Sequence, residues 1–430
     1  MENYTNYKIK NHLLKIVGVF PIQNSFEQDA INGGYALHQF DKASLPFYKD
    51  YFYKGFRDLY TLAGEDNKVK RLTKKPAALC TLTSGPKESK FYKEINLQIN
   101  QVDLFLFPDS FGVFSLDLTV QFDDSHPHLA QFSDACFIVR EFEKGIIKGS
   151  DLNWNSFIVQ EYLFGQKTRG EGIELDEYSG TKFKLFIACD FEEPLDLPTQ
   201  NALLYDIGCV AQPGTAISNE INAPSEEYKM HMAENYQFSA FRNWRGIALF
   251  DTFVLVGNNI LTSEFQLITF KENYFLIYLH NLYVKYNLFK FNTGTSDYKT
   301  DLRPELREFL NQFNLSFVSY NFLPSMINSK LRVALDIENE VNALTKRIQE
   351  IGLVVEEKSQ ERTNILLGLV SFVASLSAVE PFWDYTVKMQ QYFELPDYAA
   401  YLIIVGTITS VLGFVFFMPE KIKNFLNRWI

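Results

Sequence analysis

The sequence contains few cysteines, and they form no recognisable ligand or disulfide pattern. No two of the four are spaced as Cys-x-x-Cys; they are Cys80, Cys136, Cys189 and Cys209. This spacing excludes a zinc ribbon and a dense disulfide framework, so we expect reduced thiols in the core.

Long basic runs are also missing. The 430 residues include 41 Lys and Arg against 52 Asp and Glu, which gives a net charge of -11 at pH 7. Because proteins bind the phosphate backbone of DNA and RNA chiefly through clustered Lys and Arg, we expect no bulk nucleic acid as a partner.

Signatures of common catalytic sites and of secretion are absent too. The sequence has no GxxxxGK[ST], no GxSxG, no HExxH and no GxGxxG before a helix, so we expect a protein that is not an enzyme. The segment from Met1 to Lys15 lacks the apolar run of a signal peptide, and we expect the N-terminal part to stay in the cytosol.

Two apolar runs stand near the C-terminus. Residues 398–418 contain no Asp, Glu, Lys, Arg or His, and residues 363–379 are likewise uncharged but shorter. A helix needs roughly 20 apolar residues to cross a bilayer, so the pattern predicts two transmembrane helices, 363–379 and 398–418. A buried helical hairpin of a soluble protein is the alternative.

The charges around these runs predict their orientation. The segment 380–397 is acidic, whereas Lys and Arg precede the first run and recur in the tail 419–430. The positive-inside rule then places both termini in the cytoplasm of a two-pass inner-membrane protein, with 380–397 as an outer acidic loop.

A heptad repeat precedes the first apolar run. Its apolar residues recur at intervals of four and three, at Ile337, Val341, Leu344, Ile348, Ile351 and Val355. This spacing predicts one stalk helix over 328–362 that begins near Asn328 and continues into the first span, and whose seam packs against other copies of the chain or against returning helices of the same chain.

A stripe of small and polar residues lies beside this heptad seam. Its members are Asn364, Gly368, Ser371 and Ser375 within the first apolar run and Glu350, Glu357 and Glu361 before it. Since polar groups at bilayer depth favour a water-filled interior, we predict that the first four line a pore and the glutamates line its inner vestibule. Glu380 and Asp384 are predicted to surround the outer mouth. Close helix packing by the small residues and a solvated charged face are the alternatives.

This C-terminal organisation resembles the CorA family of divalent-metal channels. The likeness covers about 328–430: a long helix leading into the first of two spans, a short acidic outer loop and a basic tail. The resemblance implies a homopentamer in a lipid bilayer whose first spans line the pore.

The Gly-Met-Asn signature of the CorA family is absent, and Ser377-Ala378-Val379-Glu380-Pro381 occupies that region, so magnesium selectivity is not implied. Divergent CorA-like proteins without the signature occur beside type III CRISPR systems as antiviral membrane effectors. The resemblance to that branch implies a nucleotide-derived signalling ligand.

Residues 1–255 have the pattern of an α+β cytosolic sensor domain. Alternating, β-rich segments predict strands at 13–20, 77–82, 96–107, 113–122 and 182–188. Helical patterns cover 46–63 and 153–164, and a helical region over 256–327, including 271–291 and 301–322, is predicted to pack on the stalk. The predicted fold is therefore an α+β cytosolic domain followed by a stalk helix and two C-terminal transmembrane helices.

One loop carries candidate metal ligands. Asp123, Asp124, His126 and His128 follow a predicted strand, and carboxylate and imidazole groups are suitable ligands for a divalent cation. Asp, Ser and Pro are also ordinary turn residues, so a plain turn is the alternative.

Together these features predict an oligomeric membrane ion channel that is gated by a ligand of the cytosolic domain. Such a ligand must bind the open and closed states with different affinity. Two alternatives stay open: a divalent-metal transporter without the family signature, and a membrane-tethered enzyme that acts on nucleotides. No cofactor is required, although a divalent cation and a nucleotide-derived ligand are candidates.

Overall fold

The computed structural model describes residues 4–22, 25–39, 44–60, 68–84, 93–108, 111–122, 128–165, 182–221, 223–294, 303–377 and 379–394, and separated residues between 396 and 409. The chain forms two compact units, Met1–Ile348 and Gln349–Ile430.

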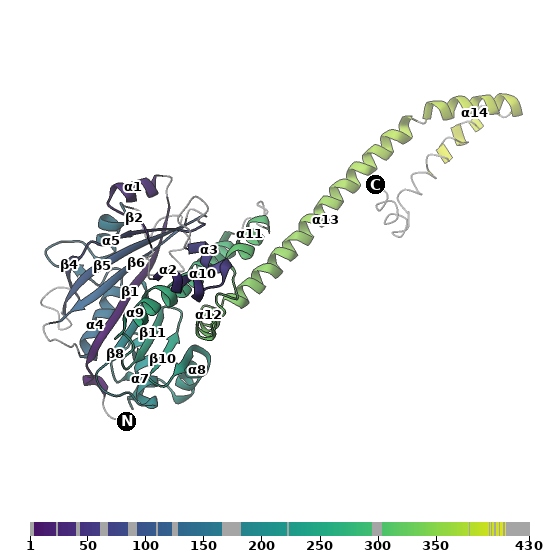
Figure 1. The fold of residues 1–430 in the computed structure, drawn as a ribbon. Coiled ribbons are helices and arrows are strands. Elements are labelled where there is room, and N and C mark those ends of the chain that lie inside the picture. The colour runs from purple at the N-terminus through teal and green to yellow at the C-terminus, as the bar shows by residue number, and fades with distance from the viewer. Residues whose placement is uncertain are drawn as a thin grey trace. The chain divides into compact units, whose positions relative to one another are not determined.

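A large mixed β-sheet forms the centre of the first unit (Figure 1). Its strands are β1 (Ile9–Pro21), β2 (Ala36–Leu37), β3 (Lys70–Lys74), β4 (Ala78–Thr83), β5 (Glu94–Phe107), β6 (Phe111–Gln121), β7 (Ile146–Ile147), β8 (Lys184–Phe191), β9 (Gln237–Phe241), β10 (Trp244–Ala248) and β11 (Thr252–Gly257). Their order is β2-β3-β5-β6-β1-β8-β11-β10-β9, and β4 pairs with β5 and β7. β8 and β11 pair in parallel, whereas β1 pairs antiparallel with both β6 and β8.

Alternate residues of the strands enter two separate hydrophobic cores. On β1, Leu14 and Ile16 face the first core, while Leu13 and Val17 face the second. Side chains alternate between the faces of a sheet, and both faces are covered here, so the central strands are apolar on both sides.

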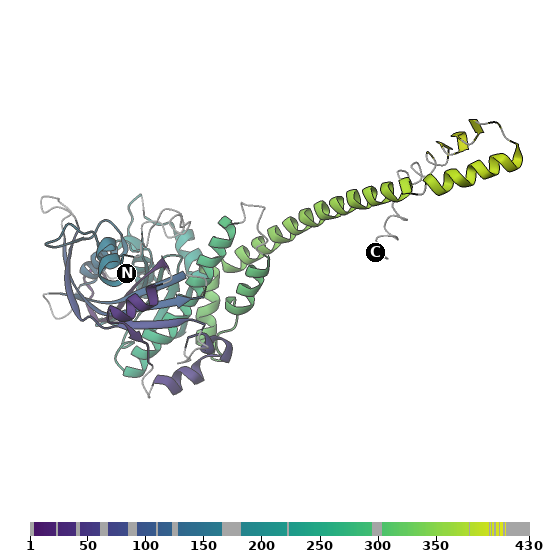
Figure 2. The same ribbon diagram turned by 90° about the horizontal axis from the view of Figure 1, so that it is seen from above.

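Helices cover both faces of the sheet (Figure 1 and Figure 2). Those that contribute to the first core are α1 (Phe26–Asn32), α4 (Leu129–Arg140), α5 (Trp154–Tyr162), α7 (Leu197–Gly208) and α8 (Glu226–Tyr236), with the short 3₁₀ helices η1 (Tyr4–Asn6) and η2 (Thr215–Ile217). Trp154 is fully buried in this core and donates its indole N–H to the carbonyl of Val139 at 3.0 Å.

The other helices of this unit lie on the face of the second core. They are α2 (Ser44–Tyr51), α3 (Lys54–Tyr60), α9 (Glu264–Ile268), the π-helical segment η3 (Thr269–Tyr274), α10 (Phe275–Gly294), α11 (Arg303–Phe313), α12 (Phe322–Ala334) and the first turns of α13 (Ile337–Ser377). Residues 275–288 of α10 are buried all round. A helix that is apolar on every side needs such a covered position.

Asp206 of α7 fixes the start of the chain. Its carboxylate accepts hydrogen bonds from the Tyr4 hydroxyl at 2.6 Å and from the backbone N–H groups of Gly214 and Ala216 at 2.7 and 2.8 Å. Burial raises the pKa of Asp206, although these hydrogen bonds act in the opposite direction. The residue therefore joins the N-terminus, α7 and the loop that follows it.

All four cysteines are free thiols. Cys136 and Cys189 are buried, and Cys80 and Cys209 are half-buried.

The predicted stalk is not one helix from near Asn328. α12 ends at Ala334, Asp336 has a positive φ of 53°, and α13 begins at Ile337. A non-glycine residue in this left-handed region cannot continue a right-handed helix, so the chain changes direction there. α13 then runs to Ser377, and α14 (Val379–Phe393) occupies most of the segment that was predicted to be an outer loop.

The transmembrane part of the predicted fold is wrong, and so is the two-pass inner-membrane location. Among the residues that the structure describes, none of the helices has both the length and the apolar character that a bilayer span requires. Beyond Arg362, its last charged residue, α13 contributes only residues 363–377, which is shorter than the roughly 20 residues needed. The predicted second span, 398–418, is described only in part, up to residue 409.

The strand predictions were more accurate. The segments 13–20 and 96–107 lie within β1 and β5, and 113–122 and 182–188 overlap β6 and β8. The structure thus supports an α+β chain with a large mixed sheet.

Candidate functional site

Charged residues interrupt the apolar face of the sheet on four neighbouring strands. They are Arg71 on β3, Asp103 on β5, Asp117 on β6 and Lys15 on β1, and each is at most 4% exposed. Asp117 faces Lys15 across the β1–β6 pair, while Asp103 faces Ser115 across the β5–β6 pair. The strand order therefore assembles a polar cluster within the second core.

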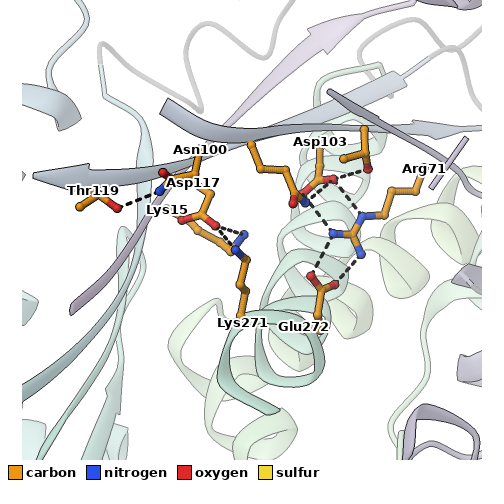
Figure 3. Close-up of polar contacts among 10 residues, drawn as sticks. Lys15, Arg71, Asn100, Asp103, Asp117, Thr119, Lys271 and Glu272 are labelled. Atoms are coloured by element: carbon orange, nitrogen blue, oxygen red, sulfur yellow. Dashed lines mark hydrogen bonds and ion pairs between the residues drawn. The ribbon is translucent and has the colours of Figure 1, made fainter. Parts of the chain in front are cut away.

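The segment η3 covers this cluster with two further charges. Lys271 and Glu272 both form ion pairs with the sheet (Figure 3). A π-helical turn is less stable than an α-helical one and occurs often at functional sites. We call these six residues, Lys15, Arg71, Asp103, Asp117, Lys271 and Glu272, the ionic cluster.

Arg71 holds one half of the ionic cluster together. Its Nε and Nη2 donate to the two oxygens of Asp103, both at 3.1 Å, and Nη1 and Nη2 donate to Glu272 at 2.6 and 3.3 Å. Gln101 and Thr73 also donate to Asp103, at 2.8 and 2.6 Å. The guanidinium is thus bidentate toward both carboxylates, which is its strongest geometry.

These contacts determine the charge states of this half. Burial is the largest single effect and raises the pKa of Asp103 and of Glu272, but the charge and hydrogen bonds of Arg71 together with the charge of Lys15 outweigh it and lower both below their ordinary values. Burial lowers the pKa of Arg71, and the two carboxylates more than compensate, so its pKa is raised. All three groups are therefore ionised at neutral pH.

Asp117 lies between two ammonium groups in the other half of the ionic cluster. Its Oδ2 is 2.5 Å from Lys271 Nζ and 3.8 Å from Lys15 Nζ. Burial lowers the pKa of Lys271, but the charge and hydrogen bond of Asp117 together with the charges of Glu272 and Asp103 outweigh that effect, and the net change is upward. Lys15 is fully buried, and its Nζ lies 4.8 Å from the ring centre of Phe275.

A line of polar side chains leads from the surface to the ionic cluster. On the same face of β6 as Asp117, Gln121 is exposed and Thr119 is half-buried. Thr119 accepts a hydrogen bond from Asn100 of β5 at 2.8 Å, next to the ionic cluster (Figure 3). The Lys271 side chain is itself 28% exposed. The ionic cluster is thus buried but lies close to water on one side.

The helix that begins above the ionic cluster also contacts the start of α13. η3 leads without a break into α10, where Lys285 forms an ion pair with Glu340 of α13 at 2.5 Å. Asn281 of α10 donates to Asn328 of α12 at 2.8 Å. One helical run therefore bonds to the sheet at one end and to α12 and α13 further along.

The ionic cluster is sensitive to the loss of any one of its charges. A buried ion pair gains little over an apolar pair of the same shape, but losing one partner leaves a buried charge unpaired and costs roughly 3–5 kcal/mol. A change at any one charge of the ionic cluster therefore alters how firmly η3 is held to the sheet.

The predicted metal ligands are not brought together as a described site. His128 precedes α4, and its Nδ1 lies 3.0 Å from the carbonyl of Asn6. Asp123, Asp124 and His126 lie outside the described residues. Within the described part of the chain, no group of three or more His, Cys, Asp or Glu side chains is placed to hold a metal ion.

The predicted pore residues are placed on helices of the second unit. Asn364 and Gly368 of α13 and Asp384 of α14 are exposed, as is Glu350 of α13. The remaining predicted residues have side chains outside the described set; they are Ser371, Ser375, Glu357, Glu361 and Glu380. Their roles in a pore and its mouths stay predictions.

Sequence reasoning missed the ionic cluster. A signal was present, because Lys15, Asp103 and Asp117 each stand at an inward position of an otherwise apolar strand, as in Leu13-Leu14-Lys15-Ile16-Val17. A charged residue at such a position needs a buried partner.

Comparisons with known proteins identified no protein similar to this chain. The resemblance to the CorA family gains no support from them, because no family model, no curated protein and no solved structure matches the chain.

Proposed function

We propose that this protein is a ligand-responsive, self-associating switch. Residues 1–348 bind the ligand, the ionic cluster controls how η3 and α10 sit on the sheet, and α13 transmits the change to other copies of the chain. The observation that carries the proposal is the single helical run η3–α10, which is bonded to the sheet through buried charges and to α13 through Lys285 and Glu340.

The first step is a change in how tightly η3 is bound to the sheet. The ionic cluster contains four ion pairs. Three of them involve Lys271 or Glu272 of η3, or Arg71, which binds Glu272 directly. A ligand that competes for one of these charges favours the state in which η3 is less tightly bound, and this differential affinity is what any switch requires.

The second step is transmission to α13. Leu344 and Ile348 of α13 belong to the same core as Leu282 and Tyr286 of α10. Packed cores respond to displacement by moving between discrete arrangements because they are close-packed. A shift of α10 therefore changes the surface against which the first turns of α13 pack.

The third step is self-association through the remainder of α13. Ile365 continues the heptad seam and is 58% exposed, and its neighbours Leu366 and Val370 are 62% and 64% exposed. Ile365 is in heptad register, and Leu366 and Val370 extend the exposed apolar surface beside it, so a second copy of this helix is the partner that fits.

Hydrogen exchange of the full-length chain tests the transmission. Glu272→Gln removes one charge from the ionic cluster, and Glu27→Gln is the matched control because Glu27 pairs with Lys70 of β3 at the surface. We expect Glu272→Gln to accelerate amide exchange across 275–294 and 337–348 at least tenfold, which corresponds to about 1.4 kcal/mol. Faster exchange confined to 269–274 would contradict the proposal.

Sedimentation velocity tests the self-association. We expect the wild-type chain to form oligomers, and the double change Ile365→Glu with Val370→Glu to shift it toward monomers. Gln360→Glu, at an exposed position off the seam, is the control and should leave the distribution unchanged. A wild-type chain that stays monomeric at all concentrations is the opposing result.

Ion conduction, metal transport and chemistry on nucleotides stay predictions of the sequence, and none of the contacts described above favours one of them.

A further inference from the structure

A heptad pattern recurs beyond the end of α13. On α14, Tyr385, Met389 and Tyr392 stand at intervals of four and three residues, which is the spacing of a heptad seam. These residues are 62%, 40% and 81% exposed. They form an exposed apolar stripe along α14, which we call the α14 stripe.

The polar residues of α14 lie on a different side of the helix. Successive residues of an α-helix are about 100° apart, so Asp384, Lys388 and Gln391 fall roughly 60–130° from the α14 stripe, and all three are exposed. Trp383 marks a third side, because its ring centre lies 5.1 Å from that of Tyr401 in the same unit. The helix therefore has one side for water and one for its own chain, and the α14 stripe belongs to neither.

The exposed apolar area is large enough for a contact between two copies. Five aromatic residues between 385 and 401 are 57–81% exposed; they are Tyr385, Tyr392, Phe393, Tyr398 and Tyr401. An aromatic side chain offers about 150–250 Å², so these five present on the order of 600 Å². Met389, Leu402 and Val405 add to this area. A stable interface takes about 800 Å² from each partner, whereas a monomer rarely exposes an apolar patch of more than a few hundred Å².

A second copy of α14 is the partner that fits this surface. In a heptad seam, side chains of one helix enter the gaps between side chains of another helix with the same spacing. A copy of the chain has that spacing and an equal apolar area. The α14 stripe contains no charged residue, so two copies can meet there without burying an unpaired charge.

We propose that α14 pairs with α14 of a second copy through Tyr385, Met389 and Tyr392. The contact between copies then continues past the end of α13 into the following helix. This inference rests on the proposed function, because it names a further segment that joins the self-associating chains.

Sedimentation velocity of the full-length chain tests the pairing. Tyr385→Glu with Tyr392→Glu places two charges in the α14 stripe and should raise the dissociation constant at least tenfold. Lys388→Glu with Gln391→Glu is the matched control; it changes exposed residues on the polar side of the same helix and should leave association unchanged. Tyr385→Phe with Tyr392→Phe keeps the apolar stripe and should also associate like the wild type.

Photocrosslinking identifies the partner segment without disturbing the stripe. A photoreactive benzoylphenylalanine in place of Tyr392 is introduced into a mixture of isotopically labelled and unlabelled chains. We expect mass spectrometry to find crosslinks that join the two kinds of chain within 379–405. Crosslinks that stay within one chain, or that lead from 392 to residues 1–348, overturn the inference.

The failure of this inference can be distinguished from that of the proposed function. If Ile365→Glu with Val370→Glu dissociates the copies and Tyr385→Glu with Tyr392→Glu does not, the pairing of α14 is wrong and the role of α13 stands. The opposite result supports the pairing and contradicts self-association through α13. A wild-type chain that stays monomeric at all concentrations overturns both.

Discussion

Replacing Arg71 is the sharpest test of the ionic cluster. Arg71→Met keeps most of the side-chain volume but removes the cation that Asp103 and Glu272 share. The side chains of Arg71 and Asp103 are 3% and 1% exposed, so water cannot replace the lost partner. Breaking such a pair costs roughly 3–5 kcal/mol, and because Gln101 and Thr73 still donate to Asp103, we expect about 4 kcal/mol.

That loss would remove much of the stability of a typical domain, which is about 5–15 kcal/mol. The triple variant Arg71→Met, Asp103→Leu and Glu272→Met should recover most of it, because apolar groups of similar volume replace a buried ion pair at little net cost. The half of the ionic cluster around Arg71 would then be dispensable for folding, as expected if it is kept for switching.

Urea denaturation followed by tryptophan fluorescence measures both effects. Trp154 is buried in the first core and Trp244 in the second, so each face of the sheet has a reporter. Lys70→Met on the same strand is the control; its ion pair with Glu27 is exposed, and we expect a change below about 1 kcal/mol. The reasoning is refuted if Arg71→Met costs less than about 1 kcal/mol, or if the triple variant is no more stable than Arg71→Met alone.

Further predictions concern pH and a second buried carboxylate. Burial lowers the pKa of His280 to about 3, below its ordinary value of about 6.5, so the unfolded chain binds the extra proton first. The free energy of unfolding should therefore fall as pH decreases from about 6.5 toward 3, by up to about 1.4 kcal/mol per pH unit for this residue. Denaturation measured at several pH values gives this slope, and His280→Gln should reduce it. An unchanged slope in the variant would contradict the prediction. Asp206→Ala should destabilise the chain by roughly 2–4 kcal/mol, because it leaves the Tyr4 hydroxyl and two backbone N–H groups without their acceptor. Tyr4→Phe, which removes only one of these hydrogen bonds, should cost about 1 kcal/mol; thermal unfolding of both variants measures the two losses, and equal losses would refute this account.

Local patterns predicted the strands well. The alternation of residues 96–107 and 113–122 is a local property of the chain, and it gave β5 and β6 with small errors at the ends. The pairing of β8 with β11 and the position of η3 over the sheet depend on contacts between distant segments, which such patterns do not contain.

In the candidate site, too, local sequence patterns could have indicated some residues but not the contacts between distant segments. Arg71 meets Glu272 across 201 positions of sequence, and no local spacing relates these two residues. By contrast, the inward-facing Lys15 could have been recognised as a residue in need of a partner, because it interrupts an apolar strand.

The transmembrane predictions failed for a different reason. Apolar content was weighed without the bounds of the helices, and α13 includes the charged residues up to Arg362 while α14 occupies the predicted loop. The heptad spacing allowed either other copies or helices of the same chain as the partner, and for Ile337, Leu344 and Ile348 the structure shows the second, because they are buried in the core of the first unit.

The π-helical form of η3 has a consequence for the whole of α10. Each residue added to a helix turns everything after it by about 100°, and a π-helical turn holds one residue more than an α-helical turn. The extra residue is therefore taken up within η3, and α10 keeps the rotational phase at which Asn281 and Lys285 lie opposite α12 and α13. Deleting a single residue between Thr269 and Tyr274 should convert η3 to an α-helical turn, which leaves the same side of α10 toward both neighbours but shifts Lys271 or Glu272 away from its partner on the sheet.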